Sequence, residues 1–75
     1  MANKPARDDV ERALHVRGHE LSPRTEHVIR MLYGLTPDGK AHSAEELAQQ
    51  MRVARVRVLQ AKDRALRQLG FEDFP

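Results

Sequence analysis

Two helical patterns separated by a very short interruption constrain this chain more than any other feature. Ser43-Ala-Glu-Glu46 has the form of a capping box, in which Ser43 caps a helix and Glu46 reaches back to the cap backbone. After a turn near residues 52–54, a longer helix is predicted over residues 55–69, and Gly70 ends it. Helices joined this closely are typical of a helix-turn-helix, although short helical hairpins also occur in proteins that never touch DNA.

Two further helices are predicted upstream. The first begins at Asp8 or Asp9, either of which can act as its N-cap, and it ends at Gly18. The second begins at Ser22-Pro23, because serine is a good N-cap and proline fits the first helical position, and it ends at Gly34. A Pro-Asp-Gly turn is expected between the second and third helices.

Length and composition point to one small all-α domain. The 75 residues include no cysteine, which excludes disulfide scaffolds, thiolate zinc sites and cysteine nucleophiles. No apolar stretch could span a membrane and no signal segment opens the chain, so we expect a cytoplasmic protein. We predict a winged-helix-like domain of three to four helices over residues 7–70. A disordered segment 1–6 would precede it and an acidic, aromatic tail 71–75 would follow, with Phe71 packed on the last helix.

Positive charge is concentrated in one segment of the chain. Residues 52–67 contain six basic residues and one acidic residue, a net charge of +5, whereas the whole chain carries +2. A basic stripe on one helix is a common feature of nucleic-acid-binding proteins, and a solvated charged face is the alternative. The residues concerned are Arg52, Arg55, Arg57, Lys62, Arg64 and Arg67, opposed by Asp63.

The last predicted helix has two distinct faces. At 100° per residue, four apolar residues fall within about 80° of one another and should face the core: Val58, Ala61, Ala65 and Leu69. Glutamine can pair with adenine, and arginine can pair with guanine or neutralise phosphate. Contact with DNA or RNA is therefore favoured for the polar residues that project from the opposite side: Arg57, Gln60, Arg64 and Arg67.

The predicted start of this helix is unusual. Ala54 offers no capping side chain, and Arg55 and Arg57 place positive charge where the helix dipole prefers negative charge. An anion docked at this end would account for the arrangement. Tertiary packing that outweighs the poor cap is the alternative.

Three consecutive stretches carry a recognisable pattern. Residues 21–35 read L-S-P-R-T-E-H-V-I-R-M-L-Y-G-L, residues 43–51 read S-A-E-E-L-A-Q-Q-M, and residues 53–69 read V-A-R-V-R-V-L-Q-A-K-D-R-A-L-R-Q-L. In this order they resemble region four of bacterial sigma factors of the housekeeping, sigma-70, class. The resemblance covers about residues 21–69.

The resemblance implies a helical domain whose helix-turn-helix reads the minus-35 promoter element in the major groove. It implies that Arg55, Arg57 and Gln60 contact bases, with Arg64 and Arg67 facing the DNA backbone. It also implies an apolar groove for the flap of the RNA polymerase β subunit. That groove would lie around five residues that periodicity alone assigns to the core: Leu32, Tyr33, Leu35, Leu66 and Leu69.

The sequence departs from the family pattern on the recognition helix. Ala54 stands where the family has a Ser or Thr cap, Val56 where it has a base-reading Glu, and Leu59 where it has an Arg. Val56 and Leu59 lie about 60° apart around the helix, beside Leu66, so two DNA-facing positions form an apolar strip. Such a strip can bind a protein partner or contact thymine methyl groups.

Other chemistry has little support in the sequence. His15 and His19 have a spacing that can bind a metal, but Gly18 separates them and no third ligand lies nearby. Because phosphate loops, nucleophile elbows and paired catalytic carboxylates are missing, we expect no enzyme, cofactor, metal or small-molecule substrate. The chain is too short for a whole sigma factor, so we expect a free-standing region-four-like protein, from a phage or mobile element for example, or an excised domain.

Two hypotheses follow. In the first, a transcription module binds promoter-like double-stranded DNA, the β flap of core RNA polymerase, or both. In the second, a sigma mimic or anti-sigma-like regulator works by protein contact through the strip of Val56 and Leu59 and has little DNA affinity; self-association through this strip is a further possibility. The DNA-binding residues expected under the first hypothesis are Arg52, Arg55, Val56, Arg57, Leu59, Gln60, Arg64 and Arg67.

Overall fold

Helices account for most of the chain that the structure describes. The computed structural model describes residues 5–71, and the absence of strands within that range confirms the predicted all-α class. Within the same range, no helix combines the length and apolar character needed to cross a membrane. Of the segment 1–6 predicted to be disordered, residues 1–4 lie outside the described residues, as does the tail predicted after Phe71; Ala6 lies within them, as the N-cap of α1. The elements are α1 (Arg7–Arg17), the 3₁₀ turn η1 (Gly18–Glu20), α2 (Pro23–Leu32), α3 (Ala44–Met51) and α4 (Arg55–Gln68).

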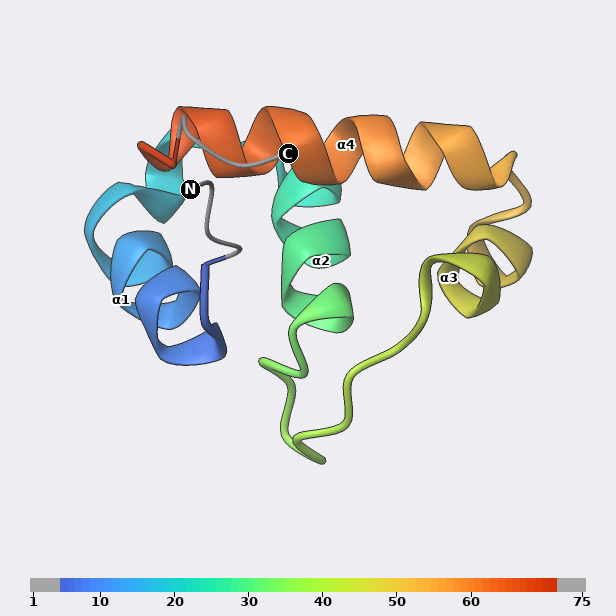
Figure 1. Cartoon of the computed structure of the whole chain (residues 1–75), viewed down its shortest axis with the longest axis horizontal. Helices are drawn as coiled ribbons and strands as arrows, with labels where there is room; N and C mark the ends of the chain where they lie inside the picture. Colours follow the sequence, from blue (N-terminus) through green and yellow to red (C-terminus); the bar gives the residue numbers. More distant parts are fainter. Residues whose placement is uncertain (1–4, 72–75) are drawn as a thin grey trace.

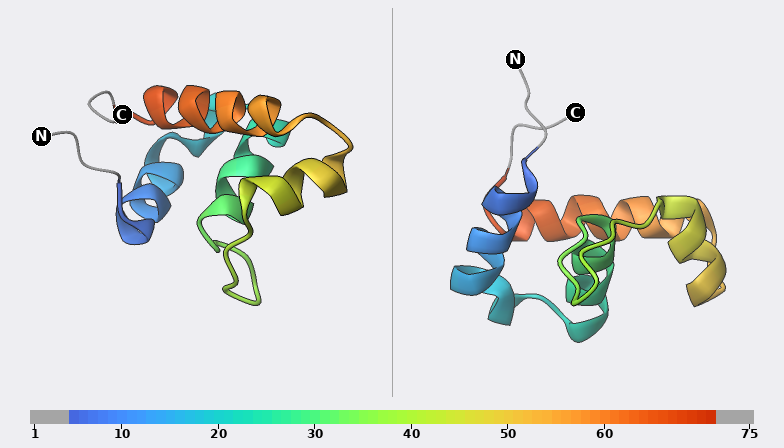
Figure 2. Two further views of the ribbon diagram at one scale, coloured as in Figure 1. Left: turned by 45° about the vertical axis from the view of Figure 1, so that its right-hand side comes forward. Right: turned by 90° about the horizontal axis from the view of Figure 1, so that it is seen from below.

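Helix α4 runs the length of the molecule, and the other three helices pack along one side of it (Figure 1). Helix α3 lies at the N-terminal end of α4, α1 lies near its C-terminal end, and α2 approaches its middle. The views in Figure 2 show the same order along α4. Because α2 contacts both α3 and α4, it fixes where the two helices of the helix-turn-helix stand.

Two apolar clusters hold the helices against α4. Adjacent residues of α2 belong to different clusters, Ile29 to the first and Val28 to the second, so one turn of α2 joins the two. Full burial of each such side chain stabilises the fold by about 1.5–3 kcal/mol. The first cluster contains Val10, Leu14, Leu21, Ile29, Ala65, Leu66 and Leu69. The second contains Val28, Leu47, Ala48 and Val58.

The predicted inner stripe of α4 is confirmed. Val58, Ala65 and Leu69 are buried, and Ala61 packs against the second cluster. The buried surface is wider than that stripe, because Leu66 is also buried, with only 1% of its surface exposed. Helix α1 packs over this part of α4 through the first cluster, and the core position that periodicity assigns to Leu66 is confirmed.

The start of α1 differs from the prediction. Its N-cap is Ala6, whereas Asp8 and Asp9 lie in the first turn. The Asp9 carboxylate accepts a hydrogen bond from the Ala6 backbone N–H at 3.3 Å, so this acidic residue supports the cap from inside the helix. The helix ends before Gly18, as predicted, but Gly18 keeps a right-handed φ of −57° and leads directly into η1.

The predicted caps of α2 and α3 are confirmed. Ser22 Oγ accepts a hydrogen bond from the Thr25 backbone N–H at 3.1 Å, and Pro23 occupies the first position of α2. Ser43 Oγ accepts from the Glu46 N–H, and the Glu46 carboxylate accepts from the Ser43 N–H, each at 3.0 Å. The capping box thus satisfies two backbone donors at the start of α3.

Left-handed glycines follow two of the helices at the predicted places. Gly34 has φ +69° after α2, and Gly70 has φ +99° after α4. Beyond Gly70, the Phe71 N–H donates to the Leu66 carbonyl at 2.8 Å, and the Phe71 side chain packs against the first cluster. The predicted turn between α2 and α3 closes with a hydrogen bond from the Gly39 N–H to the Thr36 carbonyl at 2.9 Å.

We predict that Glu46→Gln destabilises the protein at neutral pH and that this effect disappears in acid. Hydrogen bonds from Ser43 lower the pKa of Glu46 below its ordinary value of 4.5. The folded state therefore holds this proton less tightly than the unfolded state, so the stabilisation is present above the ordinary pKa and is lost as the pH falls through the lowered one. Urea titrations between pH 7 and pH 3 measure the free energy of unfolding of the original protein and of Glu46→Gln. A difference between the two that stays constant with pH would contradict the capping role of the charge.

Candidate nucleic-acid interface

A three-residue turn, residues 52–54, sets the position of α4 relative to α3. Arg52 has a left-handed φ of +58°, and the Val53 N–H donates to the Ala48 carbonyl at 3.0 Å. The Val53 side chain packs against the second cluster. Ala54 is the N-cap of α4 and provides no side-chain hydrogen bond, as predicted. The turn is therefore held by a backbone bond and an apolar anchor instead of a capping side chain.

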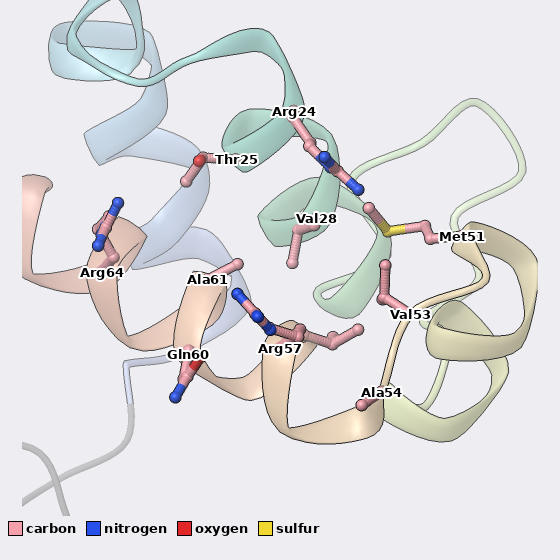
Figure 3. A pocket seen from close by; sticks show the side chains of 11 residues that line it. Arg24, Thr25, Val28, Met51, Val53, Ala54, Arg57, Gln60, Ala61 and Arg64 are labelled. Atoms are coloured by element: carbon pink, nitrogen blue, oxygen red, sulfur yellow. The ribbon is translucent and has the colours of Figure 1, made fainter.

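A groove of about 540 Å³ lies between the start of α2, this turn and α4 (Figure 3). Its floor is apolar, because it includes the buried Val58 and Val28. Three arginines line it: Arg24 from α2, and Arg57 and Arg64, which are about two turns apart on α4. The remaining lining residues are Thr25, Met51, Val53, Ala54, Gln60 and Ala61. Among the described residues that line the groove there is no carboxylate, so they present an unopposed positive charge.

The outward face of α4, formed by Val56, Gln60 and Arg67, lies beside the groove. At 100° per residue these three fall within about 40° of one another and point almost directly away from the buried Ala65. All three are exposed. A shallower hollow of about 350 Å³ continues along this side of the helix toward its C-terminal end. It is lined by Gln60, Asp63, Arg64, Arg67 and Gln68.

Arg55 is only loosely held at the start of α4. Its Nε lies 3.8 Å from the Glu45 Oε1 of α3, and both side chains are largely exposed. An exposed ion pair of this kind contributes roughly 0–1 kcal/mol. Arg55 is therefore able to exchange this contact for another anion at little cost.

The residues predicted to contact DNA divide into three groups. Arg57, Gln60 and Arg64 come together at the groove, whereas Val56 and Arg67 lie on the outward face. Arg52 and Arg55 are exposed at the turn and at the first position of α4, and Leu59 is half-buried. Every predicted polar contact residue is thus exposed.

Sequence reasoning missed Arg24 and Thr25. Both belong to the first turn of α2, 27 or more residues before the turn of the helix-turn-helix, and the fold brings them against α4. The signal available was Arg24 directly after Ser22-Pro23, because a capped helix start is also a favourable place for an anion. Periodicity predicts a helix here but does not say which end of it meets α4.

The predicted apolar strip of Val56 and Leu59 is only partly exposed. Leu66 is buried in the first cluster, so it offers nothing to a partner at the surface. Leu59 is half-buried, and Val56 is 55% exposed. Val56 is therefore the one exposed apolar side chain of this strip on the outward face, and Leu59 lies beside it.

The five residues predicted to form a polymerase-binding groove also separate. Leu66 and Leu69 are buried, whereas Leu32, Tyr33 and Leu35 are half-buried. The Lys62 Nζ lies 5.9 Å from the centre of the Tyr33 ring, and burial raises the pKa of the Tyr33 hydroxyl. We call Leu32, Tyr33 and Leu35 the α2 end patch; Leu66 and Leu69 can only support it from within.

Metal binding finds no support in the part of the chain that the structure describes. Among residues 5–71, no three histidine, aspartate or glutamate side chains are grouped so as to hold an ion. His15 lies in α1 and His19 in η1.

Comparison of the sequence with known proteins finds a matching family. The family model described as "Sigma-70, region 4" matches residues 19–69. RNA polymerase sigma factor SigA of Nostoc sp. is 41% identical over 63 residues, which is 84% of this chain and 15% of the relative. SigA1 of Synechococcus elongatus is 39% identical over 69 residues, 92% of this chain and 16% of the relative. The chain thus spans about one-sixth of the length of these relatives. No solved structure matches significantly.

We predict that Arg52→Gly makes the domain more stable than Arg52→Ala by about 1 kcal/mol. A left-handed backbone costs a residue with a Cβ about 1–2 kcal/mol, and glycine avoids this cost but loses more chain entropy on folding. Both variants remove the same charged side chain, so the comparison isolates the backbone of the turn. Thermal unfolding measures the difference; equal stability would show that φ +58° is not maintained in solution.

Proposed function

Since the chain belongs to the sigma-70 region 4 family, we propose that it is a sigma-factor module that binds promoter DNA through α4 and the groove beside it. The observation that carries the proposal is the convergence of Arg24, Arg57 and Arg64 on one groove whose described lining includes no carboxylate. These arginines come from two helices that are far apart in sequence. A charged surface that only contacts water does not require arginines from two helices to line one groove. Binding of a DNA phosphate backbone is favoured by that arrangement.

The arrangement suggests how DNA would be held. With the N-terminal half of α4 in the major groove, Gln60 on the outward face would reach base edges, where glutamine can pair with adenine in two hydrogen bonds. Arg57 and Arg64 would face the sugar-phosphate backbone at one edge of the major groove, where they would neutralise phosphates. Arg24 would contact the same strand from the first turn of α2. Base selection and backbone anchoring would thus come from neighbouring sides of one helix.

The start of α4 favours the same mode of binding. The backbone N–H groups of its first turn have no side-chain cap, and Arg55 and Arg57 lie where a helix prefers negative charge. A DNA phosphate near Ala54 would satisfy those donors and offset the unfavourable charge. Packing of Val53 and Val58 into the second cluster keeps this end helical in the absence of DNA.

A second contact, with the flap of the RNA polymerase β subunit, would use the α2 end patch. Its three side chains are partly exposed at the end of α2, on a different part of the chain from the DNA-facing groove. None of the three lines the groove, so the two contacts would use different residues. The competing proposal is a regulator that binds only protein, through Val56, and has little DNA affinity.

We predict that Arg24→Ala and Arg64→Ala each weaken binding to all DNA sequences alike. Each loss of a phosphate contact should reduce the slope of log K against log salt concentration by about 0.9. Fluorescence anisotropy with a labelled promoter duplex across a salt series measures both effects. Arg12→Ala, an exposed arginine of α1, is the matched control and should leave the slope unchanged. Equal slopes in all four proteins would contradict the proposed groove.

We also predict that the purified chain captures core RNA polymerase only when the β flap is intact. The α2 end patch is the surface assigned to this contact, and it is remote from the arginines of α4 in sequence. A pull-down with intact core enzyme and with core enzyme lacking the flap provides the test. Capture of both forms, or of neither at low salt, would refute a flap contact without bearing on DNA binding.

A further inference from the structure

One apolar side chain projects from the centre of the proposed DNA-reading surface. Val56 and Val16 are the exposed large hydrophobic residues of the described chain, with 55% and 64% of their surfaces exposed. A single exposed valine, such as Val16 on α1, needs no special explanation. Val56 is different in its position, because it lies in the first turn of α4 between Arg55 and Arg57.

Val56 shares its orientation with Gln60. The two residues are four apart, so they lie about 40° from each other around α4 and about one turn apart along it. Both are exposed, and both point away from the buried Val58 and Ala65. A recognition helix contacts base edges mainly with its N-terminal residues. Any placement of α4 in the major groove that lets Gln60 reach a base therefore also brings Val56 to a base edge, one or two base pairs away along the DNA.

The chemistry of valine restricts what Val56 can meet there. Its side chain has no hydrogen-bond donor or acceptor, and a base amino or carbonyl group buried against it would lose its water without gaining a partner. In the major groove the largest apolar group on a base edge is the C5 methyl of thymine. Leu59, half-buried and about 60° further around the helix, extends the apolar surface on one side of Val56.

We propose that Val56 is a specificity-determining residue that selects thymine through its C5 methyl group. This inference rests on the proposed DNA-binding function and adds to it the identity of one base. It requires a preferred DNA site with a thymine close to the base read by Gln60. It also requires that the preference for thymine depends on the methyl group and on the valine side chain together.

Deoxyuridine provides the direct test, because it differs from thymidine only by this methyl group. The preferred site is first selected from a pool of short duplexes with a randomised centre, and each thymine is then replaced singly by deoxyuridine. We expect one replacement to weaken binding of the original protein about three- to fivefold, the value of one buried methyl contact. In Val56→Ala the same replacement should have no effect, whereas Val16→Ala should keep the full loss.

The possible failures are distinct. Steeply salt-dependent DNA binding that is insensitive to every deoxyuridine replacement would overturn the role of Val56 and leave the proposed function intact. The role of Val56 is equally overturned if the sensitive thymine remains as sensitive in Val56→Ala. Absence of DNA binding at low salt would overturn the proposed function itself, and a protein partner lost in Val56→Glu would then explain the exposed valine.

Discussion

Packing of α2 against the inner side of α4 is the contact on which the rest of the structure depends. Val28 and Ile29, neighbours on α2, anchor the two apolar clusters of a very small core. Through the first cluster α4 is tied to α1, and through the second it is tied to α3. The same contact places the first turn of α2 beside α4, where Arg24 lines the same groove as Arg57 and Arg64. The packing of α2 against α4 therefore forms both the core and the charged groove.

Local preferences are violated at the start of α4, where the protein is proposed to meet DNA, and are satisfied at the starts of α2 and α3. Helices α2 and α3 have serine caps. By contrast, α4 begins without a cap, Arg52 holds a left-handed backbone, and arginines occupy the positive end of the helix dipole. Departures of this kind tend to mark functional sites, because tertiary packing must offset them. Here the second cluster provides that packing, and a polyanion would remove part of the cost.

Most of the fold could be predicted because its signals are local. Each of these signals acts within a few residues: the Ser22-Pro23 helix start, the capping box at Ser43, and the left-handed Gly34 and Gly70 after their helices. Each does what its chemistry indicates. The predictions that failed needed tertiary information. Arg24 could not be placed beside α4, because the sequence does not say which end of α2 meets that helix. The cap at Ala6 was missed because the aspartate that supports it lies three residues inside the helix.

The central claim is that DNA lies along α4 and across the first turn of α2. Backbone amide NMR spectra recorded while a promoter duplex is added to the isotope-labelled chain test it most directly. The account predicts the largest shifts at Thr25, Arg57, Gln60 and Arg64, with little change in α1. Shifts confined to α1 or to the α2 end patch, with the signals of α4 unchanged, would contradict it.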